Sequence, residues 1–111
     1  MLMSEEKIKV ATEFGLFPYG RYPEHGQFNG ERFRKEFLVR SLRDGNRLLV
    51  DLDGARGLQP SFLEEAFGGL VREGFSEAQL REQITIKSSD DPSYIEEIWS
   101  YVSDAAKRNT Q

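Results

Sequence analysis

The sequence feature that most constrains the fold is a short apolar run, Leu-Leu-Val-Asp-Leu at residues 48–52, bounded by Asn46 and Gly54. Three leucines and a valine in so short a run predict a central β-strand. Segments with strand and helix periodicity alternate along the chain on both sides of it. This order predicts an α/β fold in which right-handed crossovers connect parallel strands.

Further elements are predicted around this central strand. Apolar and polar residues alternate from Lys7 to Phe14, which is the period of a strand with one buried face, and residues 84–86 predict another strand. Helical spacing predicts helices over 30–43, over 61–73 and after Asp91-Pro92, and a short turn after Ser76. We therefore expect a small domain with a mixed sheet of about four strands, packed with three or four helices.

Two helix starts carry capping signals. Asn29 is a candidate N-cap for the first helix, and Ser61 with Glu64 forms a capping box for the second. Gly68 and Gly69 lie inside that second helix, where each costs about 1 kcal/mol relative to alanine. Such a cost indicates a close approach by a neighbour; we favour packing of the helix on the sheet over docking of a partner's backbone.

The segment 15–30 is rich in glycine and proline and is predicted to be a loop, with or without a short hairpin. It is long for so small a domain, and long ordered loops are often functional. Its aromatic and leucine residues leave a second interpretation open, in which the loop covers the core. His25 is expected to be exposed there.

Length and composition exclude several classes of protein. The 111 residues suit one domain, with residues 1–6 and 107–111 expected to fray. Without cysteine, and with one histidine, disulfides and zinc–thiolate sites are excluded, and no metal or cofactor is expected. Fifteen basic against nineteen acidic residues give a net charge of −4, which disfavours nucleic acid. No apolar stretch has membrane length, so we expect a cytoplasmic protein without membrane contact.

Asp51 and Asp53 follow the central strand, where ligands bind in open α/β sheets. Asp-Leu-Asp-Gly resembles the first motif of the haloacid-dehalogenase phosphatases, which implies a small magnesium-dependent phosphatase with one aspartate as nucleophile. Ala55 stands where that motif has threonine, and Asp90-Asp91 offers a second acidic pair. The alternative is that both aspartates accept hydrogen bonds from loop amides.

Ser61 starts a helix, where free backbone amides and the helix dipole favour a phosphate group. The same position in a nucleotide-binding module would hold a nucleotide phosphate. A purely structural helix cap is the simpler alternative.

Four separated motifs occur in order: Phe17-Pro18-Tyr19-Gly20-Arg21-Tyr22, Asn29-Gly30-Glu31-Arg32-Phe33-Arg34, Asp51-Leu52-Asp53-Gly54, and the stretch from Ser61-Phe62 to Gly69-Leu70. Together they resemble the bacterial STAS-like family of unknown function, over roughly residues 7–87. That family is related to the STAS domains of anti-sigma-factor antagonists and is often encoded beside histidine-kinase-like ATPases.

The resemblance implies a non-enzymatic regulatory module that binds a histidine-kinase-like ATPase or an anti-sigma-type protein. Ser61 matches the phosphorylated serine of the antagonists, with Gln59, Pro60 and Phe62 replacing the residues around it. The residues expected to contact the partner surround Ser61 or enter from the arginine-rich segment; they are Arg21, Asp53, Arg56, Gln59, Phe62 and Glu65. Arg32 and Arg34 either join this surface or pair with nearby acids. The oligomeric state stays open.

Overall fold

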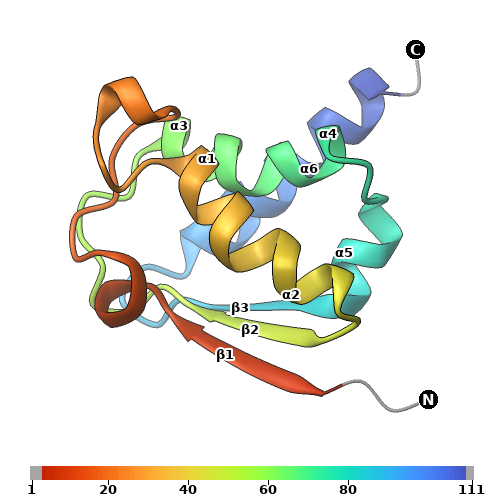
Figure 1. Ribbon diagram of the computed structural model, residues 1–111, viewed down its shortest axis with the longest axis horizontal. Helices are drawn as coiled ribbons and strands as arrows, with labels where there is room; N and C mark the ends of the chain where they lie inside the picture. The colour runs from red at the N-terminus through yellow and green to blue at the C-terminus, as the bar shows by residue number, and fades with distance from the viewer. Residues whose placement is uncertain (1–3, 110–111) are drawn as a thin grey trace.

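In the computed structural model, which describes residues 4–109, three parallel strands form one layer and the helices cover one of its faces (Figure 1). The strands are β1 (Glu5–Lys9), β2 (Arg47–Asp51) and β3 (Ile84–Lys87), in the order β1-β2-β3. The predicted central strand is therefore central, and the α/β class is confirmed. The expectation of a mixed sheet of about four strands is wrong, because the described residues form three strands, all parallel.

The first strand was predicted over residues 7–14 but ends at Lys9, and Val10–Phe14 forms a π-helical turn, η1. Val10 and Phe14 are both buried. Residues four apart share a face in a helical turn as well as in a strand, so the alternation could not separate the two structures. The loop that follows contains the short 3₁₀ helix η2 (Pro23–His25) and no hairpin strands.

Two long helical segments each contain a π-helical stretch. The first combines α1 (Gly30–Phe33), η3 (Arg34–Val39) and α2 (Arg40–Arg43); the second combines α3 (Pro60–Leu63), η4 (Glu64–Gly68) and α4 (Gly69–Arg72). The Asn29 side chain accepts a hydrogen bond from the Arg32 amide at 2.9 Å, which confirms it as the N-cap. The first helix has the predicted bounds.

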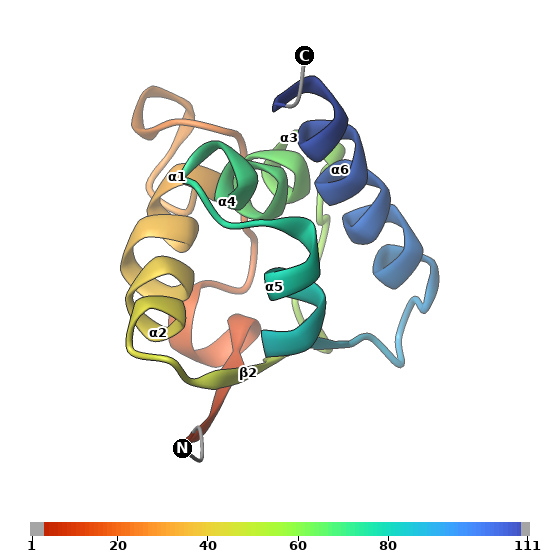
Figure 2. The same cartoon turned by 90° about the vertical axis from the view of Figure 1, so that its right-hand side faces the viewer.

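Two further helices complete the layer (Figure 2). The first is α5 (Glu77–Gln83), which the Ser76 side chain caps as predicted, and the second is α6 (Ser93–Asn109). Ile98, Val102 and Ala105 form the buried face of α6. Figure 2 shows α6 alongside the helical segment of α3 and α4. None of the described helices is long and apolar enough to cross a membrane.

The core lies between the sheet and the helices. Phe14 from η1 meets Phe33 and Phe62 from the two long helical segments, with ring centroids 5.0 and 6.1 Å apart. Ile8, Leu48 and Val50 cover this cluster from the sheet and are almost completely buried. The end of η1 and the start of the loop 15–30 are thereby fixed against the two helices.

Regular structure reaches into both of the stretches that were expected to fray. Glu5 and Glu6 lie in β1, and Lys107–Asn109 lie in α6, although both stretches were expected to fray. The remaining residues of the predicted frayed ends, 1–3 and 110–111, lie outside the described residues.

Candidate functional site

Ser61 occupies the second position of α3 and does not cap it. The helix begins at Pro60, and Gln59 takes the N-cap position without a side-chain hydrogen bond. A proline ring fixes φ near the helical value, so the helix starts one residue before the serine. The predicted capping box of Ser61 and Glu64 is therefore wrong. The Ser61 hydroxyl has no hydrogen-bond partner among residues 4–109.

Ser61 instead lines an open hollow of about 310 Å³ between the start of α3 and the loop 15–30. The other lining residues are Tyr19, Gly20, Arg21, His25 and Gln59. The Gly20 amide donates a hydrogen bond to Gln59 Oε1 at 3.3 Å, which joins the loop to the residue before the helix. The half-buried serine thus lies where the loop and the helix meet.

His25 is exposed, as expected, but it also orders the loop. Its Nδ1 accepts hydrogen bonds from the Arg21 and Tyr22 amides, both at 3.2 Å. An imidazole nitrogen can accept only while it carries no proton. The Gly20 backbone, at φ +79°, lies against the His25 side chain, and a Cβ on Gly20 would overlap it. His25 therefore holds the turn beside Ser61 in one shape.

The same loop exposes four large apolar side chains. Leu16, Phe17, Tyr19 and Tyr22 are 45, 61, 54 and 38% exposed, and we call them the aromatic loop surface. The backbone amide of the exposed Arg56 donates to Leu16 O at 2.8 Å, so this arginine borders the surface. Exposed aromatic side chains beside an arginine are typical of protein interfaces. The interpretation in which these aromatic residues cover the core holds only for Phe14, at the end of η1, and for Phe28.

Two residues expected to contact a partner are internal. Phe62 is fully buried, and Glu65 is 5% exposed and paired with Arg34, itself 6% exposed. Arg34 Nη1 donates to Glu65 Oε2 at 2.8 Å and also to the Glu65 carbonyl, and Arg34 Nε donates to Glu73 at 3.1 Å. Arg34 therefore pairs with acids, but with distant ones in a buried position and not with the nearby acids expected, and it connects the two long helical segments. Arg32 does pair with a nearby acid, Glu36, at 3.2 Å.

Arg21 also pairs inside the molecule, with Glu64 at 2.5 Å and with Glu65 at 3.3 Å. Arg72 contacts the same Glu64 at 2.8 Å. Burial raises the pKa of Glu64, but the hydrogen bonds from Arg72 and Arg21 outweigh it and hold this pKa below its ordinary value. Glu64 therefore stays ionised and anchors Arg21, and with it the loop, to the helix.

The paired glycines of the second helix face side chains and α6, not the sheet. A Cβ on Gly69 would overlap the Arg34 guanidinium, and one on Gly68 would meet Glu64 and the Tyr101 carbonyl. The close approach that the sequence predicted is present, but the expected packing of these glycines on the sheet is wrong. No local pattern in the sequence indicates that Arg34 is buried and needs this space.

Asp51 and Asp53 hold the loops at the carboxyl ends of β2 and β3. Asp51 is 2% exposed, and its Oδ1 accepts from the Asp53 amide at 2.9 Å. Asp53 Oδ1 accepts from the amides of Asp90 and Ser89, at 2.9 and 2.7 Å, and these bonds lower its pKa. Asp90 in turn accepts from the Gly54 amide. These contacts are those of the loop-amide alternative, and residues 4–109 contain no cluster of three acidic or histidine side chains arranged to hold a metal ion.

The predicted site residues fall into four groups, of which the first, Phe62 and Glu65, is buried. Ser61, Gln59 and Arg56 lie at or beside the aromatic loop surface, Arg21 joins the loop to the helix, and Asp53 belongs to the loop contacts at the sheet edge. The exposed Phe17, Tyr19 and Tyr22 were not singled out as contact residues. Their position in a glycine- and proline-rich loop was the available signal.

Comparison with known families identifies the domain, over a region that includes three of the four motifs noted in the sequence. A family model described as a STAS-like domain of unknown function matches residues 29–94, which is more than half of the chain. Neither the curated proteins nor the solved structures gave a match. The matched region contains the two long helical segments, β2 and β3, and the resemblance found in the sequence is confirmed. The chain belongs to the family of STAS-like domains of unknown function.

Proposed function

We propose that this domain is a regulatory protein-binding module that engages a histidine-kinase-like ATPase or an anti-sigma-type protein. The aromatic loop surface forms the contact, together with Arg56, Gln59 and Ser61 at the start of α3. The observation that carries this proposal is the exposure of Phe17 and Tyr19, each more than half accessible, beside the hollow that contains Ser61.

The position of Arg21 supports a switch at Ser61. Arg21 lines the hollow with Ser61 while its guanidinium pairs with Glu64. A phosphate on Ser61 would bring about −1.5 to −2 charges and three acceptor oxygens next to this arginine. Arg21 would then have two competing anionic partners, and its neighbour Tyr22 belongs to the aromatic loop surface. Phosphorylation would in this way change the shape of the contact surface without unfolding the domain.

The test is a calorimetric titration of the purified domain with a histidine-kinase-like ATPase, chosen from the neighbouring genes where one is encoded there. Phe17→Ser and Tyr19→Ser should each weaken binding at least tenfold, because aromatic anchors dominate such interfaces. Thr85→Ser, exposed on the far face of the sheet, is the control and should bind as wild type does. Unchanged affinity in both loop variants would place the contact elsewhere.

Ser61 is tested in the same assay. Ser61→Asp should change the affinity for the ATPase, whereas Ser61→Ala should leave it close to that of wild type. Because Ser61 does not cap α3, the alanine variant should also keep its thermal stability. Equal affinity of wild type, Ser61→Asp and Ser61→Ala would show that Ser61 is not a switch. The contact surface would then be tested by the loop variants alone.

A further inference from the structure

Among residues 4–109, no strand pairs with the outer edge of β1, and the backbone geometry shows which groups are available there. Arg47 N donates to Ser4 O at 2.8 Å, and Glu5 is the register partner of Arg47. In a parallel ladder, alternate residues direct both backbone groups to the neighbouring strand. Ser4, Glu6 and Ile8 therefore face β2, and Glu5, Lys7 and Lys9 direct their amides and carbonyls away from the sheet.

One of these three outward residues is already occupied. The Lys9 amide donates to the Glu13 carboxylate at 2.7 Å. Glu13 thus closes the end of the edge nearest η1, and within the described residues the outward backbone groups of Glu5 and Lys7 have no hydrogen-bond partner. The opposite edge of the sheet offers fewer donors, because the Ile84 amide is taken by the Leu80 carbonyl, which leaves Ile86 with the one outward amide of β3 that has no partner among residues 4–109.

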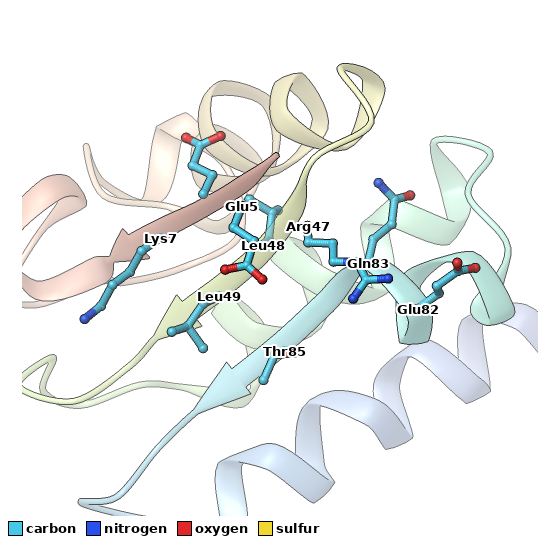
Figure 3. A pocket seen from close by; sticks show the side chains of 9 residues that line it. Glu5, Lys7, Arg47, Leu48, Leu49, Glu82, Gln83 and Thr85 are labelled. Carbon is cyan, nitrogen blue, oxygen red and sulfur yellow. The ribbon is translucent and has the colours of Figure 1, made fainter. Parts of the chain in front are cut away.

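The side chains of the two free residues carry opposite charges on one face. Glu5 and Lys7 are exposed and project from the face of the sheet that the helices do not cover, beside Arg47 and Leu49 on β2 (Figure 3). These four residues also border an open hollow of about 500 Å³ on this face. When two such strands run antiparallel with Glu5 opposite Lys7, the two-fold symmetry produces two Glu5–Lys7 pairs of opposite charge. The edge is therefore complementary to itself.

We propose that two copies of the chain pair through their β1 strands, antiparallel, to form one continuous six-stranded sheet. The amide and carbonyl of Glu5 bond to those of the second copy's Lys7, and the symmetric pair repeats this, which makes four backbone hydrogen bonds. The two-fold axis passes beside Glu6. Glu6 lies opposite Glu6 of the second copy, so two like charges approach each other there. The Glu6 carboxylate points to the helix side and accepts hydrogen bonds from Ser41 and Asn46, which reduces this repulsion. This register leaves the Lys9 amide with Glu13.

Charge reversal tests the register directly. Glu5→Lys places two like-charged pairs across the two-fold axis, and so does Lys7→Glu, so each variant alone should dimerise about tenfold more weakly or worse. Mixed together, the two variants restore both opposite-charge pairs and should form a heterodimer. Sedimentation velocity and native mass spectrometry of the full chain measure both results, with Thr85→Lys on β3 as the matched control that should dimerise as wild type does.

A backbone variant tests the hydrogen bonds. Lys7→Pro removes an amide that faces away from β2, and proline is tolerated at such an edge position. This variant should fold, as circular dichroism can verify, and should be monomeric. Higher salt should weaken the wild-type dimer, since exposed charges are screened.

A wild-type chain that stays monomeric up to millimolar concentration would overturn the proposal. Lys7 and Glu13 would then be residues that prevent the edge strand from pairing with another chain. A dimer that survives Lys7→Pro, or charge variants that fail to form a heterodimer, would overturn it as well. The loop variants Phe17→Ser and Tyr19→Ser should not affect dimerisation, so this proposal and the proposed function stand or fall separately.

Discussion

Arg34 and Gly69 meet between the two long helical segments, where the guanidinium fills the space that a side chain at residue 69 would need. The same guanidinium is held by Glu65 and Glu73 and is almost completely buried. It cannot move aside without breaking these bonds. Gly69 is unfavourable for helix formation, but the absence of a side chain there leaves the space in which the buried Arg34 guanidinium lies.

We expect Gly69→Ala to destabilise the domain by about 1–3 kcal/mol through overpacking, although alanine favours a helix by about 1 kcal/mol. Gly68→Ala is the matched control. Its Cβ would meet the end of the Glu64 side chain, which is less buried than Arg34, and the loss should be smaller. Urea unfolding of both variants measures the difference, and a Gly69→Ala protein as stable as wild type would contradict the packing described here.

Replacing Arg34 by methionine should cost about 3 kcal/mol, because the buried Glu65 carboxylate loses its closest cation. The double variant Arg34→Met with Glu65→Leu should recover much of that loss, since the buried carboxylate is then gone and Glu73, the other partner of Arg34, is partly exposed. Lys35→Met, which breaks an exposed pair with Glu31, should change stability by less than about 0.5 kcal/mol. Denaturant titrations measure the free energy of unfolding of each variant. A double variant that loses more stability than the two single variants together would show that the pair has another role.

Glu64 makes stability depend on pH. Its pKa in the folded protein lies below the ordinary value of 4.5, so its contribution is complete above that value and is lost as the pH falls through the folded pKa. Stability should therefore drop from about pH 5 downward, and less steeply in Glu64→Gln. Unfolding curves between pH 7 and pH 3 provide the comparison. Parallel curves for the two proteins would exclude Glu64 as a source of the slope.

His25→Ala should loosen the loop without unfolding the domain, because the Arg21 and Tyr22 amides lose their acceptor. Hydrogen exchange should rise at residues 20–26, while amides in β2 stay as protected as in wild type. Glu24→Ala, an exposed neighbour in the same turn, is the control. Equal exchange in wild type and His25→Ala would mean that the loop keeps its shape through Gly20 and Gln59 alone.

Asp51→Ala should lower stability by about 1–2 kcal/mol, because the Asp53 amide loses its acceptor at a buried carboxylate. The wild-type protein should hydrolyse a generic phosphate ester with magnesium no faster than buffer does. Turnover above that background that disappears in Asp51→Asn and Asp53→Asn would establish the phosphatase alternative instead.

Local sequence signals predicted the elements whose causes are local. The Asn29 cap, the helix bounds at 30–43 and the apolar strand around Val50 depend on neighbours within a few residues, and the structure confirms them. The end of β1 could not be predicted in this way, because the spacing of Val10 and Phe14 fits a strand and a helical turn equally well. The start of α3 was misplaced by one residue, because Pro60 sets the helical backbone before Ser61 can cap it.

The site was predictable only in part, because its arrangement depends on contacts between distant segments. The motif order located Ser61 and its neighbours, but a sequence does not show that Arg34 is buried against Glu65, 31 residues away. Nor does it show which aromatic residues of the loop face outward. Phe14 and Phe28 pack against each other beside the helices, whereas Phe17 and Tyr19 are exposed. All four are aromatic, and the difference arises from the path of the folded chain.

The loop 15–30 is tied down at several backbone positions, from the Arg56 amide at Leu16 to the Gly30 amide at the Gly20 carbonyl. Its conformational entropy is thus already lost when the chain folds. A partner that meets Phe17 and Tyr19 encounters a rigid arrangement, and little further ordering opposes association. Binding should then show fast, single-step association, and partners of different affinity should differ mainly in their dissociation rate constants.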